Sequence, residues 1–112
     1  MTSKRQPQTL EEVAEYLRDR ELSDIVQVAK EPAGRRFIMR LLNMCGTFGN
    51  PFTGNSKTFY NCGMQAVGQE LFKDLMEADP DLFPIMQRES LIRENDDARM
   101  VKLAEQREAD GE

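Results

Sequence analysis

Three arginines that lie close together, Arg35, Arg36 and Arg40, are the strongest candidates for a binding function in this sequence. On a helix, Arg36 and Arg40 share a face because they are four residues apart. A guanidinium group binds carboxylates and phosphates through two parallel hydrogen bonds. Two interpretations follow. The cluster forms ion pairs with Glu or Asp of flanking helices, or it docks on an acidic protein surface or on DNA phosphates.

Catalytic chemistry has little support in the residue types. The chain contains no His, so it lacks the commonest general base and the usual partner of a Ser or Cys nucleophile. Two cysteines, Cys45 and Cys62, do not make an ordinary zinc site. In a reducing compartment we expect two small, buried thiols rather than a disulfide. The prediction is a non-enzymatic protein with no catalytic residue, no metal site and no cofactor.

Two other segments match ligand sites only in part. Residues 54–58, Gly-Asn-Ser-Lys-Thr, lack the Gly-Lys-Ser/Thr order of a phosphate-binding loop and fit an ordinary junction between a loop and a helix. Glu94, Asp96 and Asp97 could hold a hard cation, but an acidic trio on an exposed helix is usually solvated. Neither segment changes the prediction.

The N-terminal part predicts two short helices after a disordered leader, residues 1–8. Thr9 followed by Glu12 has the spacing of a capping box, which predicts a helix of about 11 residues that ends near Arg20. Ser23 is suited to cap a second helix. The apolar positions of that helix would be Ile25, Val26, Val28 and Ala29.

The best-defined unit is a helix–loop–helix from Pro32 to Asp79. Pro32 fits the first turn of a helix, and Gly46 fits the position just after its end. Apolar spacing predicts one wide face toward the core, with the polar side opposite. The predicted apolar face consists of Phe37, Ile38, Leu41, Leu42, Met44 and Cys45, and the polar side of Arg35, Arg36, Arg40 and Asn43.

Residues 46–55 form a loop, because Gly, Asn and Pro recur there and cannot continue a helix. Phe48 and Phe52 lie in it, and either anchor the loop on the core or bind a partner. Anchoring is favoured, since a loop of this length needs contacts. Both phenylalanines join the three arginines as candidate partner-binding residues.

Ser56 or Asn55 caps the next helix, which contains Gly63 and Gly68. Each Gly costs about 1 kcal/mol relative to Ala inside a helix, so we expect the preceding helix to pack closely there. A binding groove is the alternative. The predicted apolar ladder is Tyr60, Met64, Val67, Leu71 and Leu75, widened by Phe59, Ala66, Phe72 and Met76.

Asp79 and Pro80 predict another helix, with Asp79 as the N-cap and Pro80 at its first position. Residues 88–112 are charged and poor in apolar residues, so they form a solvated helix or a tail that orders on a partner. Residues 95–97, Asn-Asp-Asp, are the place where such a helix would break. We therefore expect a helical domain over 9–87 and a separate tail.

The predicted fold is all-α: a small helical domain centred on the helix–loop–helix unit, with a charged, partly helical C-terminal tail. A net charge of -5 argues against nucleic-acid binding through the overall field, which needs a surplus of Lys and Arg. No apolar run approaches the roughly 18–20 residues that span a bilayer, and the N-terminus lacks a signal sequence. We expect synthesis in the cytoplasm and no membrane contact.

An ordered set of short motifs runs through the central unit: Glu31–Phe37 (Glu-Pro-Ala-Gly-Arg-Arg-Phe), Leu41-Leu42, Cys45-Gly46-x-Phe48, a stretch from Phe52 to Gly63, and Val67-Gly68. Together they resemble a family of small tailed-phage proteins whose named member comes from a Bordetella podovirus. The resemblance covers roughly residues 30–80. One departure is Cys62-Gly63-Met64-Gln65, which stands where a more basic stretch would be expected and weakens an inherited nucleic-acid contact.

The resemblance implies a product of the phage head and structural gene cluster, without an established activity. Our first hypothesis is a virion or assembly protein that docks on portal, head or internal core components, in the host cytoplasm during assembly and then either released or kept in the virion. The second is a DNA-binding or packaging accessory that acts through the three arginines. The charged tail also makes a homo-oligomer plausible.

Overall fold

The computed structural model describes residues 6–111, and the predicted leader lies mostly outside this range. Within it the chain forms four α-helices and no strand, which confirms the all-α prediction. The helices are α1 (Leu10–Ala29), α2 (Pro32–Met44), α3 (Lys57–Ala78) and α4 (Leu82–Asp110). No helix of this part of the chain is long and apolar enough to cross a membrane.

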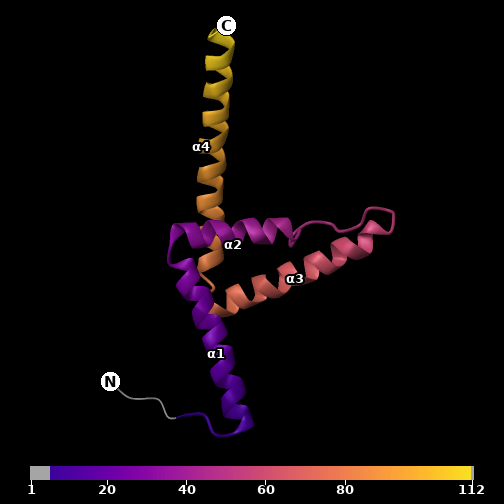
Figure 1. The fold of residues 1–112 in the computed structure, drawn as a ribbon, viewed down its shortest axis with the longest axis vertical. Helices are drawn as coiled ribbons and strands as arrows, with labels where there is room; N and C mark the ends of the chain where they lie inside the picture. The colour runs from indigo at the N-terminus through magenta and orange to yellow at the C-terminus, as the bar shows by residue number, and fades with distance from the viewer. Residues whose placement is uncertain (1–5, 112) are drawn as a thin grey trace.

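The molecule is flat and extended. Its principal extents are 71 × 46 × 20 Å, and its radius of gyration is 20.0 Å, whereas a compact chain of this length has about 13 Å. In Figure 1, α1 and α4 project from opposite ends, while α2 and α3 converge toward the loop that joins them. Much of α1 and of α4 therefore lies outside the central packing.

The core is small and lies where the four helices meet. It contains residues from each helix, and Leu42 and Leu75 are completely buried at its centre. Partly buried side chains, among them Leu71 and Phe72, pack around it. The buried hydrophobic cluster consists of Ala29, Ile38, Met39, Leu42, Leu75 and Met86.

The prediction of two N-terminal helices is wrong, because α1 is continuous from Leu10 to Ala29. Its start is as predicted: the Thr9 hydroxyl accepts a hydrogen bond from the Glu12 backbone N–H at 3.1 Å. Between Arg20 and Ser23 stand only Glu and Leu, which favour helix, and neither Gly nor Pro interrupts the chain. Ser23 therefore lies inside a helix instead of capping one.

The start and end of α2 are confirmed. Pro32 is in its first turn, and Gly46 adopts a φ of 63° just after its end. The Gly46 N–H donates to the Asn43 carbonyl at 3.0 Å, and the Thr47 N–H donates to the Leu42 carbonyl at 3.2 Å. These two hydrogen bonds together define a Schellman cap. A glycine is required there because other residues rarely adopt this φ.

The predicted faces of α2 are partly wrong. Phe37 and Met44 are exposed, whereas Met39 is buried. Arg35 lies on the inner side, since it precedes Ile38 by three residues and Met39 by four. The buried side of α2 is thus rotated relative to the prediction. Arg35 can lie on that side because its guanidinium group forms an ion pair with a carboxylate there.

Helix α3 begins as predicted, and Asn55 supplies the cap. Its Oδ1 accepts the Lys57 backbone N–H at 2.9 Å, while Ser56 makes no side-chain capping bond. The expected close packing holds at Gly68, where an added Cβ would meet Thr47 Oγ1 and lie 2.7 Å from Cys45 Cβ. It does not hold at Gly63, which has nothing within 4 Å.

Helix α4 begins two residues later than predicted. Asp79 still starts the turn, since its Oδ1 accepts the Asp81 backbone N–H at 3.0 Å, but the first helical residue is Leu82. From there the helix continues without a break through residues 95–97 to Asp110. Residues 94–111 are all exposed, so this half of α4 stands clear of the rest of the described chain.

Candidate partner-binding surface

Arg35 is fully engaged inside the molecule. Its Nε and one terminal nitrogen donate to the two carboxylate oxygens of Glu89 at 2.8 and 2.9 Å. The other terminal nitrogen donates to the backbone carbonyls of Ala29 and Lys30, at 2.9 and 3.1 Å. Arg35 therefore ties the end of α1 and the start of α2 to α4. Of the two interpretations offered by the sequence, the ion pair describes this arginine.

Glu89 makes the stability of this junction depend on pH. Hydrogen bonding from Arg35 holds the pKa of the Glu89 carboxyl below its ordinary value of 4.5, and the charges of Arg93 and Arg36 act in the same direction. A carboxyl with a lowered pKa in the folded state stabilises the fold at all pH values above its unfolded pKa. That stabilisation is lost as the pH falls through the lowered pKa.

We predict that Glu89→Gln lowers the melting temperature at pH 7, and that the difference from the wild type shrinks as the pH falls from about 5 toward 3. Thermal melts of both proteins across this range measure it. Glu105→Gln is the matched control on the exposed half of α4, and its difference should be small throughout. If Glu89→Gln lowered the melting temperature equally at pH 3 and pH 7, the stabilising role of the ionised Glu89 carboxylate beside Arg35 would be contradicted.

Arg36 and Arg40 point away from the core and meet a third arginine that the sequence analysis missed. Arg93 of α4 joins them on a shallow, open depression that also includes Ala33 and Phe37. None of the three arginines has an ion-pair partner within the described residues. We call Arg36, Phe37, Arg40 and Arg93 the arginine surface.

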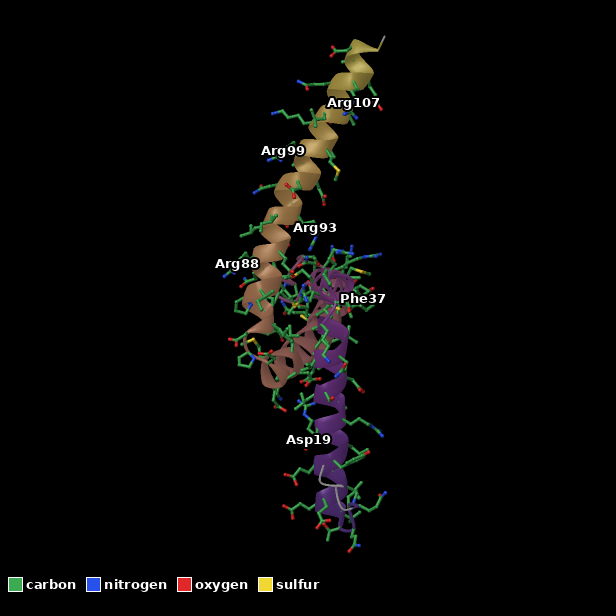
Figure 2. All side chains as sticks on the ribbon, turned by 90° about the vertical axis from the view of Figure 1, so that its left-hand side faces the viewer. Asp19, Phe37, Arg88, Arg93, Arg99 and Arg107 are labelled. Atoms are coloured by element: carbon green, nitrogen blue, oxygen red, sulfur yellow. The ribbon has the colours of Figure 1, made fainter. Side chains whose placement is uncertain are left out.

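The arginine surface lies on one side of α4. Figure 2 shows Arg93 on the side of α4 nearer Phe37, while Arg88 points to the other side of the helix. Phe37 is 60% exposed among the three guanidinium groups. Asp96 and Asp97 lie with Arg36 and Arg93 at the neighbouring depression, so the positive charge is bounded on one side. A ligand that fits here combines acidic groups with an apolar contact.

The two loop phenylalanines have different positions. The Phe48 ring lies 5.1 Å from that of Phe72 and 5.4 Å from that of Phe83, in an aromatic cluster beside the core. This agrees with the favoured role as an anchor, although the outer part of Phe48 stays exposed. Phe52 has no such cluster and is 70% exposed. Phe52 is therefore a candidate contact residue that lies away from the arginine surface.

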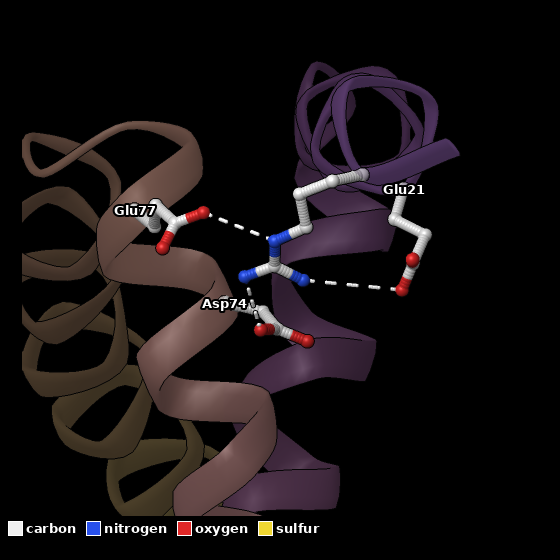
Figure 3. Close-up of polar contacts among 4 residues, drawn as sticks. Glu21, Asp74 and Glu77 are labelled. Carbon is white, nitrogen blue, oxygen red and sulfur yellow. Dashed lines mark hydrogen bonds and ion pairs between the residues drawn. The ribbon is translucent and has the colours of Figure 1, made fainter. Parts of the chain in front are cut away.

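The sequence pattern also gave no sign of Arg18, a second arginine that binds carboxylates of another helix. Arg18 of α1 donates to Asp74 at 2.8 Å and to Glu77 at 3.0 Å on α3, with Glu21 close by (Figure 3). These hydrogen bonds raise the pKa of the Arg18 guanidinium above its ordinary value. No pattern in the sequence links α1 to α3, so only the packing of the helices reveals this cluster. It joins helices and leaves no group free for a ligand.

The thiols and carboxylates offer no further site. Both thiols are free, and Cys45 is buried as expected, but the expectation of burial is wrong for Cys62, which is exposed on α3. Within the part of the chain that the structure describes, no three Cys, Asp or Glu side chains are placed to hold a metal ion. The arginine surface is therefore the best candidate for function.

The sequence that forms this surface matches a known protein family over most of its length. The model of the Bbp19-like phage proteins matches residues 26–88, more than half of the chain. The chain belongs to this family. No curated protein and no solved structure matches it. The Bbp19-like region contains α2, the loop, α3 and the beginning of α4, so it includes Arg36 and Arg40, while Arg93 lies just beyond it.

Membership in the Bbp19-like family makes this a phage protein, as the resemblance in the sequence implied. The matched region includes the whole buried hydrophobic cluster, from Ala29 to Met86. Most of α1, up to residue 25, and α4 beyond residue 88 lie outside it. The matched region thus corresponds to the central fold, and the two projecting helix ends lie outside it.

Proposed function

We propose that this Bbp19-like protein is a non-enzymatic virion or assembly protein that docks on portal, head or internal core components of the phage. It would act in the host cytoplasm during assembly, and would then be released or kept in the particle. The family gives the phage context. The observation that supports docking is the arginine surface, with three unpaired guanidinium groups around an exposed Phe37.

The chemistry of the arginine surface favours a protein partner. Interfaces are enriched in Arg and aromatic residues, which bury apolar area and bind carboxylates at the same time. The arginine surface gathers three unpaired guanidinium groups on a chain with a net charge of -5, so an acidic patch of a partner would be oriented toward it. The partner would therefore present Asp or Glu beside an apolar pocket for Phe37.

The test is affinity isolation of the tagged protein, with crosslinking, from cells in which the phage is assembling. We expect portal, head or core proteins to be captured, and Arg36→Glu with Arg40→Glu to reduce that capture at least tenfold. Arg88→Glu is the matched control, because it reverses a charge on the other side of α4 and should leave capture unchanged. Equal capture by all variants would contradict docking through this surface.

DNA binding is a second candidate, and the same three unpaired arginines favour it. Each arginine that contacts a phosphate releases counterions, so affinity would fall steeply with salt. The acidic pair Asp96 and Asp97 beside the surface and the negative net charge oppose it. Fluorescence anisotropy with duplex DNA at low salt discriminates the two functions: binding that Arg36→Glu abolishes supports DNA, and no binding excludes it.

A further inference from the structure

Each projecting end of the molecule carries a short stripe of exposed apolar residues. On α1, Leu10, Val13 and Leu17 recur at i, i+3 and i+7, and Leu10 is 90% exposed. On α4, Met100 and Leu103 recur at i and i+3, and Met100 is 61% exposed. Such spacing makes one face of a helix suited to another helix.

The two stripes share one pattern. Leu10-x-x-Val13-Ala14 on α1 and Met100-x-x-Leu103-Ala104 on α4 place two large apolar residues and one Ala at the same positions of the helix. An Ala beside larger side chains lets a second helix approach closely. One turn further along the same face lie Leu17 on α1 and the charged Arg107 on α4. They can therefore lie against each other over about two turns.

Their charges are opposite. Residues 10–17 contain three Glu and no Lys or Arg, a net charge of -3. Residues 98–107 contain Arg99, Lys102 and Arg107 against Glu105, a net charge of +2. Asp97 and Glu108 stand on either side of this basic window, so the charges match only when the two stripes are aligned. Complementary charge of this kind steers association and fixes the register.

The two stripes of one chain cannot meet. Figures 1 and 2 show α1 and α4 projecting in opposite directions, along a molecule whose long dimension is 71 Å. We propose that the Leu10–Leu17 stripe of one copy binds the Met100–Arg107 stripe of a second copy, head to tail. Such a contact uses different surfaces on the two partners, so repetition closes a ring or extends a filament. It uses neither Arg36 nor Arg40 and does not depend on the proposed function.

Sedimentation velocity on the full chain, from about 10 to about 500 μM at low salt, tests the proposal. A contact of this small area is weak between two copies, and ring closure strengthens it. We expect species heavier than the 12.9 kDa monomer that grow with concentration and decrease as salt is raised. A monomer at every concentration would overturn the proposal.

Two variants decide the geometry of the contact. Val13→Glu and Leu103→Glu each place a charge in one stripe, and each alone should give monomers, since these exposed positions do not support the core. An equimolar mixture should give dimers only, because just one intact pair of stripes remains. Continued assembly of either single variant, or a mixture that stays monomeric, would contradict the head-to-tail arrangement. Leu91→Glu, an exposed position outside the stripes, is the control that keeps assembly.

Discussion

Replacing Leu42 by Ala is expected to lower the free energy of unfolding by about 2–5 kcal/mol, the range for deleting a buried leucine side chain. Leu42 has no exposed surface and belongs to the cluster that joins all four helices. The core holds few fully buried side chains, so a cavity at its centre removes a large share of the contacts that hold α2 in place. Urea denaturation followed by circular dichroism measures the loss.

Leu91→Ala is the matched control for Leu42→Ala, because it makes the same change at a position that is 64% exposed. Its effect should stay within about 0.5 kcal/mol, as for most surface substitutions. A similar loss for both variants would contradict the placement of the core. A loss below 1 kcal/mol for Leu42→Ala would do so as well.

Gly34→Ala is expected to destabilise the protein by about 1–3 kcal/mol, or to prevent folding. A Cβ at Gly34 would collide with the backbone carbonyl oxygen of Val28 and lie 2.8 Å from its carbonyl carbon. Backbone atoms cannot rotate away as a side chain can, so α1 and α2 would have to move apart. That movement would also pull Arg35 from the Ala29 and Lys30 carbonyls that it binds. Thermal melts give the size of the effect.

Gly63→Ala is the matched control for Gly34→Ala, since both replace a helical glycine by the same residue. Nothing lies within 4 Å of the added Cβ at Gly63. Ala should therefore stabilise α3 by up to about 1 kcal/mol through its higher helix propensity. Opposite signs at the two positions are the expected result, and equal effects would show that the close contact between α1 and α2 is misplaced.

Local patterns in the sequence predicted the helix ends well where one residue type determines them. Pro32, Gly46 and Thr9 each mark a boundary through backbone or capping chemistry that acts within a few residues. Ser23 failed as a boundary because a serine that can cap a helix is also tolerated inside one. Only a helix-breaking residue next to it would have separated the two possibilities.

The candidate surface was less predictable, because it depends on which helices touch. Arg35, Arg36 and Arg40 are close in sequence, but the packing of α1 and α4 against α2 separates the engaged Arg35 from the free Arg36 and Arg40. Arg93 lies 53 residues beyond Arg40, and no periodicity connects them. Phe37 was expected in the core because of its apolar spacing, but it is exposed. Apolar spacing does not specify how a short helix is rotated when its neighbours cover only part of it.

The central claim is that this Bbp19-like protein takes part in building the phage particle. Quantitative mass spectrometry of purified proheads and mature virions tests it most directly, with the major head protein as the internal standard. We expect the protein in proheads at a reproducible copy number, whether or not the virions keep it. Absence from both particles, while the protein is abundant in the infected cell, would contradict the claim.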